Sequence, residues 1–174
     1  MAVSLEPKYV WAYYQRGVAY GAKGDNVHAI ADFNQAIKLD PKLASAFDNR
    51  GLAWGRMKEY EKAIADYSEA IRLDPKFVSA WNDRAWEEAT AIEPKIRDGK
   101  KAVADSTKAV ELAGSKEDPL LLTTLAAAYA EAGDFELAAK WQARAVELAP
   151  STEQKTDWQA RLDLYRGRQA YREN

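Results

Sequence analysis

The chain has 174 residues, of which 47% are hydrophobic, and its 25 basic and 27 acidic residues give a net charge of −2. This composition predicts a well-packed soluble protein and excludes a disordered tail. The mildly acidic balance lacks the broad basic surface that binds nucleic acid, so we expect no nucleic-acid partner. No long apolar run and no basic, apolar leader occur, so we expect no membrane association and a cytoplasmic location.

The first residues match the end of a later segment. Ala2-Val3-x-Leu5-x-Pro7 has the layout of Ala36-Ile37-x-Leu39-x-Pro41, so residues 1–9 are expected to be the end of a preceding, incomplete repeat. Residues 10–43 then carry apolar side chains at helical spacing in two stretches, and Asp40-Pro41 stops the second stretch. A helical hairpin is predicted here.

Residues 44–77 repeat this layout 34 residues later, and two further copies follow. The third is expected at 78–116, with an insertion near 92–100, and the fourth at 117–150. Residues 151–174 are expected to form a capping helix and a tail, because Trp158, Leu162 and Tyr165 fall on one helical face after a cap at Ser151 or Thr152.

The residues shared between copies include Gly17, Tyr20, Ala29, Phe33 and Pro41 in the first. They resemble the pattern W-x2-L-G-x2-Y…A-x3-F…P of the tetratricopeptide repeat family, which has a 34-residue period. The resemblance implies an all-α fold: a right-handed α-solenoid of about four helical hairpins with a C-terminal capping helix, in one domain over 1–174.

One departure from the family pattern is systematic. Where the pattern has leucine before the small residue, the first three copies have arginine, and each of them also has an aspartate at one position of its second stretch. We therefore expect structural ion pairs within the hairpins: Arg16–Asp32, Arg50–Asp66 and Arg84–Asp105. The fourth copy has Leu125 and Trp141 instead. Arginines presented to an anionic ligand are the weaker alternative.

Groups for catalysis are scarce, so we expect no enzyme, no cofactor and no metal site. The chain has no cysteine and only one histidine, His28, which is expected to be a solvated side chain. Lys95, Arg97, Lys100 and Lys101 gather at the insertion, which is either a solvated loop or an electrostatic contact point.

The family resemblance implies a protein-interaction scaffold whose first helices line a concave groove for a partner peptide or helix. The residues that it places in the groove are Trp11, Tyr14, Gln15, Val18, Asp48, Asn49, Leu52, Asn82, Asp83, Trp86, Thr123 and Thr124. Gln15, Asn49 and Asp83 hold equivalent positions, where they could hydrogen-bond a peptide backbone. The alternative is that some of these residues, Val18 and Leu52 among them, belong to the core.

The expected partner is a protein or peptide that carries basic and aromatic residues, since Asp48 and Asp83 accompany Trp11, Tyr14 and Trp86. Some relatives hold the acidic C-terminal tails of chaperones with a clamp of lysine, arginine and asparagine. The matching positions here are Tyr14, Val18, Asn49, Ser79 and Asp83, so only the asparagine is kept and such tails are not expected to bind.

Two other functions remain open from the sequence. The chain could be a structural module that self-associates end to end, as a homo-oligomer, through its incomplete first repeat near Trp11 and Tyr13. It could also be a non-catalytic module of a longer protein.

Overall fold

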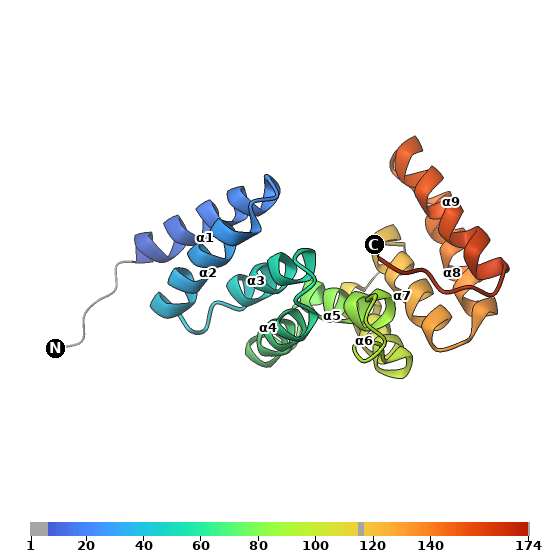
Figure 1. Ribbon diagram of the computed structural model, residues 1–174, viewed down its shortest axis with the longest axis horizontal. Coiled ribbons are helices and arrows are strands. Elements are labelled where there is room, and N and C mark those ends of the chain that lie inside the picture. Colours follow the sequence, from blue (N-terminus) through green and yellow to red (C-terminus); the bar gives the residue numbers. More distant parts are fainter. Residues whose placement is uncertain (1–6, 115–116, 174) are drawn as a thin grey trace. The chain divides into compact units, whose positions relative to one another are not determined.

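A computed structural model describes residues 7–114 and 117–173, which form helices and turns only and divide into two compact units. The N-terminal unit extends to Ala80, and the C-terminal unit begins at Trp81. The all-α helical-repeat fold expected from the sequence is confirmed (Figure 1). The preceding partial repeat expected at 1–9 falls mainly on residues 1–6, which lie outside the described part of the chain.

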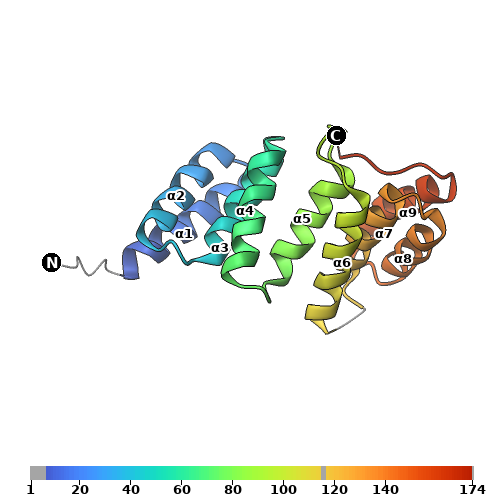
Figure 2. The same ribbon diagram turned by 90° about the horizontal axis from the view of Figure 1, so that it is seen from below.

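The N-terminal unit consists of two hairpins (Figure 2). Helices α1 (Pro7–Ala22) and α2 (Asn26–Leu39) form the first, and α3 (Ala44–Arg56) and α4 (Tyr60–Leu73) form the second. Gly24 turns the chain between α1 and α2 with a φ of 79°, and Lys58 does so between α3 and α4 with a φ of 62°. A left-handed backbone is easy for glycine and strained for lysine.

Close contact between the helices of each N-terminal hairpin depends on a glycine against an aromatic ring. A β-carbon on Gly17 would lie 2.8 Å from the ring of Phe33, and one on Gly51 would lie 2.7 Å from that of Tyr67. Both rings are fully buried in the core. The two glycines therefore let the helices approach closely, because the buried rings leave no room for a β-carbon.

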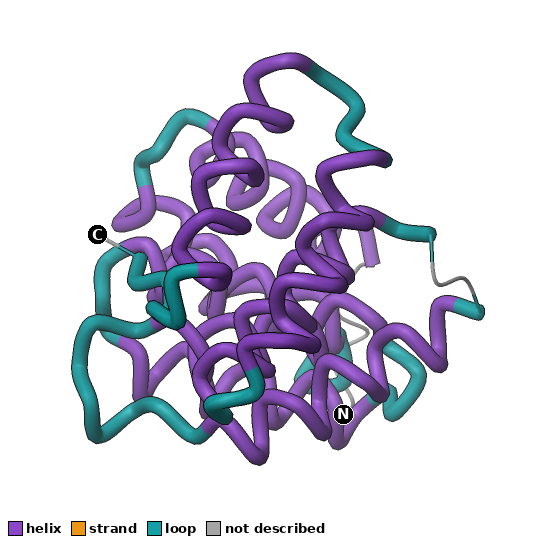
Figure 3. The backbone as a smooth tube through the Cα atoms, turned by 90° about the vertical axis from the view of Figure 1, so that its right-hand side faces the viewer, coloured by secondary structure: helices purple, strands orange, loops and turns teal. Residues whose placement is uncertain are grey.

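The C-terminal unit contains most of α5 (Val78–Thr90), followed by α6 (Gly99–Ala113), α7 (Pro119–Glu131), α8 (Phe135–Glu147) and α9 (Thr152–Arg166). The loop between α5 and α6 covers residues 91–98, where the sequence predicts an insertion. Figure 3 shows the described residues as helices joined by loops and turns. Side chains cap the starts of several helices by accepting hydrogen bonds from backbone N–H groups. Asp98 caps α6, Asp134 caps α8 and Ser151 caps α9.

In this unit an alanine replaces each interhelical glycine, and a smaller side chain replaces each aromatic ring. Ala85 is matched in sequence with Ser106, and Ala126 with Gln142; all four are buried. Helix α9 packs on α8, and Gln142 Nε2 donates to the Trp158 carbonyl oxygen at 3.0 Å. Trp158, Leu162 and Tyr165 are buried, so α9 covers the last hairpin.

None of the described helices is both long and apolar enough to cross a bilayer.

Candidate protein-interaction surface

The structure brings together the two ion pairs expected in the N-terminal unit. Arg16 donates to Asp32 through Nε and Nη2, at 2.7 Å each. Arg50 donates to Asp66 through the same two nitrogens, at 2.7 and 2.6 Å. Each guanidinium also lies over an aromatic ring of its own helix, Arg50 over Phe47 for example. These arginines hold the hairpins together, and their paired aspartates neutralise them.

The third pair, Arg84–Asp105, has the same geometry in the C-terminal unit, at 2.7 and 3.1 Å. In the fourth copy Leu125 and Trp141 stand at the two positions and line a pocket of about 330 Å³. Trp141 Nε1 is buried there without a hydrogen-bond partner among the described residues. The apolar pair of the fourth copy therefore lies beside an open pocket.

The predicted groove residues of the N-terminal unit come from α1 and α3, and we call this set the α1–α3 face: Trp11, Tyr14, Gln15, Val18, Asp48, Asn49 and Leu52. Trp11, Gln15 and Val18 are exposed, whereas Asp48 is buried. Asn49 Nδ2 donates to the Ser45 carbonyl oxygen at 2.9 Å and to the Tyr14 hydroxyl at 3.2 Å.

A pocket of about 180 Å³ opens on this face and brings Val18, Asn49 and Leu52 together. Phe33 forms part of its wall, and Arg56 closes one side by donating through Nη1 to the Gly21 carbonyl oxygen at 2.8 Å. The pocket combines apolar walls with a polar amide, which is the usual character of a small binding site.

In the C-terminal unit the predicted groove residues form the α5–α7 face: Asn82, Asp83, Trp86, Thr123 and Thr124. Thr123 and Thr124 are buried, and their hydroxyls donate to the Leu120 carbonyl oxygen of their own helix. Asn82 Nδ2 donates to Asp83 at 3.0 Å, while the buried Asn82 Oδ1 has no partner among the described residues. Trp86 is half-buried.

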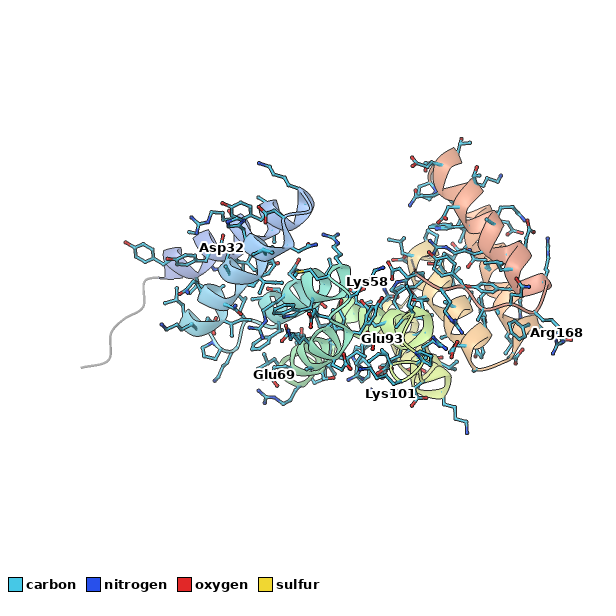
Figure 4. All side chains as sticks on the ribbon, viewed as in Figure 1. Asp32, Lys58, Glu69, Glu93, Lys101 and Arg168 are labelled. Atoms are coloured by element: carbon cyan, nitrogen blue, oxygen red, sulfur yellow. The ribbon has the colours of Figure 1, made fainter. Side chains whose placement is uncertain are left out.

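The C-terminal segment, residues 167–173, leaves α9 through a turn at Arg168 and runs to α5 without forming a helix or strand (Figures 1 and 4). The backbone N–H of Glu173 donates to the Thr90 carbonyl oxygen at 3.0 Å. The Trp86 indole N–H donates to the Glu173 carboxylate at 2.6 Å. The segment therefore contacts Trp86, which the sequence placed in the groove.

Glu87 is buried on α5, and its Oε2 has no hydrogen-bond partner among the described residues. Burial is the main cause that raises the pKa of Glu87 to about 8, and the nearby carboxylates of Glu173 and Asp83 contribute to the same shift. Its neighbour Glu88 has a raised pKa through burial as well, although Lys101 pairs with it and opposes the shift. The α5 helix thus buries two acidic groups.

The basic residues of the insertion are partly used within the unit (Figure 4). Arg97 donates to Glu131 on α7 at 3.1 Å and to two carbonyl oxygens of its own loop. Lys101 pairs with Glu88, and Lys95 lies 3.1 Å from Glu93.

His28 lies on the exposed surface of α2. Its ring stacks on that of Tyr20, and Nδ1 is 2.8 Å from Asp25. Across residues 7–114 and 117–173, no three histidine or carboxylate side chains lie close enough to hold a metal ion.

Sequence reasoning missed the buried Glu87 and the contacts of the C-terminal segment. Arg161, Tyr171 and Glu173 contact Trp86, and Arg172 donates to Glu131. The signal that could have indicated them is Tyr171-Arg172, an aromatic and basic pair just beyond α9. This pair has the chemistry expected of a groove ligand.

Solved structures with a similar fold include three helical-repeat proteins. The type IV pilus biogenesis factor PilW has a TM-score of 0.77 and 20% identity, over 91% of this chain and 70% of its own. PilF of Pseudomonas aeruginosa has a TM-score of 0.73 and 19% identity, over 92% and 70%. The TPR2B domain of yeast Sti1, in a complex with pHsp70, has a TM-score of 0.62 and 22% identity, over 70% and 96%.

No curated protein matches the chain in sequence. Tetratricopeptide repeat models match residues 10–43, 45–77 and 121–152, which together make up more than half of the sequence. The chain belongs to the tetratricopeptide repeat family.

Proposed function

We propose that this tetratricopeptide repeat protein is a non-catalytic scaffold that binds a partner peptide or helix on the first helices of its hairpins. The observation that carries this proposal is the pocket on the α1–α3 face, because it brings together Val18, Asn49 and Leu52 from two successive first helices. A segment lying across α1 and α3 can place a side chain in this pocket.

The partner that fits best carries apolar or aromatic residues together with lysine or arginine. Val18 and Leu52 provide apolar walls, and exposed Trp11 offers a ring face to a cation. Both amide hydrogens of Asn49 are engaged, so its carbonyl oxygen is the part that can accept a hydrogen bond from a partner's backbone. Acidic chaperone tails are not expected to bind, because this face lacks the basic clamp.

The test compares two substitutions of exposed valines. Val18→Glu places a charge at the pocket, whereas Val27→Glu places the same charge on α2, at a residue that does not line the pocket. On an array of basic, aromatic and acidic peptides, Val18→Glu should lose binding to basic, aromatic peptides that Val27→Glu retains. Equal binding by both variants, or stronger binding of acidic peptides, would contradict the proposal.

End-to-end self-association is a second candidate, favoured by the exposure of large apolar residues on the first hairpin. Tyr9 is 61% exposed and Val27 64%. If this hairpin is a self-association surface, the molar mass from light scattering should rise with concentration, and Val27→Glu should abolish the rise. A monomer at all concentrations would exclude this function.

A further inference from the structure

We propose that the C-terminal segment is an intramolecular ligand of the α5–α7 face, and that this face binds, in competition with it, an extended partner segment in which an aromatic residue precedes arginine. The inference rests on the proposed function and specifies for it a partner motif and a means of regulation.

Tyr171 occupies an aromatic and cationic site built by α5 and α9. Its ring centroid lies 5.9 Å from that of Trp86 and 4.5 Å from the Arg161 guanidinium carbon. Arg161 also lies 5.2 Å from the Trp86 ring. A ring that lies beside both an indole and a guanidinium gains stacking and cation–π energy together, so this site selects an aromatic side chain.

Arg172 occupies an anionic site at the end of α7. Its Nη2 donates to Glu131 at 2.6 Å, and Nη1 points to the Ala89 carbonyl oxygen on α5 at 3.4 Å. The Glu131 side chain is 16% exposed and that of Arg172 is 33% exposed, so the pair is partly shielded from water. The combination of a carboxylate and a carbonyl at different angles suits the planar donors of arginine better than lysine.

The backbone of the segment is recognised as well. The Glu173 N–H donates to the Thr90 carbonyl oxygen. This oxygen lies in the last turn of α5, where carbonyl groups have no N–H donor from their own helix. On the same helix, the buried side-chain oxygen Asn82 Oδ1 has no hydrogen-bond partner among the described residues and is a second acceptor. Such acceptors can bind the backbone of any extended chain, while the Tyr171 and Arg172 sites decide which sequence fits.

The segment has features of a replaceable ligand. It forms no regular structure, and its Gln169 and Glu173 side chains are exposed. The Glu173 carboxylate also lies near the Glu87 side chain, and repulsion between the two carboxylates disfavours Glu173 at this position when Glu87 is ionised. A partner with an aromatic–arginine pair and no acidic residue after it would avoid this repulsion and displace the segment.

The first experiment follows the Trp86 indole N–H by NMR in the 174-residue chain, with the signal assigned by means of Trp86→Phe. The double variant Tyr171→Ser, Arg172→Ala should shift this signal, because the Glu173 carboxylate leaves it. A labelled peptide with the sequence of residues 166–173 should then bind the double variant about 10-fold or more tightly than the wild type, since a tethered competitor is lost. A peptide with the same two substitutions should not bind.

An unchanged Trp86 signal, or equal peptide affinity for the two proteins, would overturn the inference. A second variant covers the case in which the first one unfolds. Because the chain has no cysteine, Thr90→Cys with Glu173→Cys can form only one intramolecular disulfide. Oxidation should close the site to the peptide and reduction should reopen it. Failure of the two cysteines to join, or peptide binding to the locked form, would contradict the docked position.

The outcomes separate this inference from the proposed function. Loss of partner binding in Val18→Glu tests the α1–α3 face, while the peptide competition tests the α5–α7 face. If the peptide fails and Val18→Glu still loses its partner, only the inference is wrong. If the peptide competes but Val18→Glu has no effect, the binding surface of the scaffold lies in the C-terminal unit.

Discussion

Arg50 joins Asp66 through two hydrogen bonds and also reaches the preceding hairpin, where its Nη1 donates to Asn34 at 2.6 Å. One guanidinium thus connects α3 to its own second helix and to α2. Only 20% of the Arg50 side chain is exposed, compared with 59% of Arg16. The same pair of residue types therefore has different surroundings in successive copies.

Removing Arg50 should cost more stability than removing Arg16. Arg50→Ala leaves the Asp66 carboxylate buried and unpaired, which should lower the free energy of unfolding by about 3 kcal/mol. Arg16→Ala should cost less, because the Arg16 guanidinium is exposed to water, whereas Arg50 is shielded and also donates to Asn34. Urea denaturation of both variants measures the difference, and an equal loss would show that burial does not determine the contribution.

Replacement of Lys58 by glycine should make the protein more stable. Its φ of 62° is left-handed, so Lys58→Gly should raise the free energy of unfolding by about 0.5–1 kcal/mol after the greater freedom of the unfolded chain is subtracted. Gly24→Ala is the matched control at the equivalent turn and should be destabilising. Thermal denaturation of both variants provides the comparison; a loss in Lys58→Gly would contradict the expected strain.

Docking of the C-terminal segment should weaken as pH rises. The pKa of Glu87 is about 8 with the segment in place, and release removes the Glu173 carboxylate that helps to raise it, so the pKa of Glu87 should fall. In the docked state Glu87 therefore holds its carboxyl proton more tightly. This stabilisation of the docked state is fully present below the pKa that Glu87 has after release, and it is progressively lost as the pH rises to about 8.

The Trp86 indole signal, followed from pH 5.5 to 8.5, should move toward its position in the tail-disrupted double variant. Glu87→Gln is the control, because its amide keeps the size of the side chain and cannot ionise. This variant should lose most of the pH dependence. An undiminished shift in Glu87→Gln would assign the effect to another group.

An arginine–aspartate pair like those of the other three copies should be tolerated in the fourth copy only when Leu125 and Trp141 are replaced together. Leu125→Arg alone buries an unmatched cation and Trp141→Asp alone buries an unmatched anion, so each should be destabilising. The double variant should be more stable than the sum of the two losses predicts, by about 1–3 kcal/mol of coupling. A double-mutant cycle in urea measures this energy, and strict additivity would show that the pair does not form.

The hairpins and their pairs could be predicted from the sequence because they rest on local or repeated spacing. Arg16 and Asp32 are separated by one hairpin turn, and the same offset recurs at Arg50 and Asp66. Repetition turns a weak pattern into a strong one. The helical fold follows from the same periodicity of apolar residues.

The C-terminal site could not be predicted in this way. Trp86 and Glu173 are 87 residues apart, and no repeated offset connects them. Their contact depends on where α9 ends and on the left-handed turn at Arg168, so it is a property of tertiary packing. Likewise, the spacing that placed Thr123 and Thr124 on the inner face could not show that their hydroxyls donate to Leu120.

The matched sizes across each hairpin limit how this protein can be recombined. Gly51 tolerates Tyr67 only because it has no side chain, whereas Ala85 stands in a copy whose corresponding residue is Ser106. A chimera joined within a hairpin would set alanine against an aromatic ring or glycine against serine, with a clash in one case and a void in the other. Exchange of whole hairpins keeps each matched pair intact, so the hairpin is the smallest segment that can be transplanted without a compensating substitution.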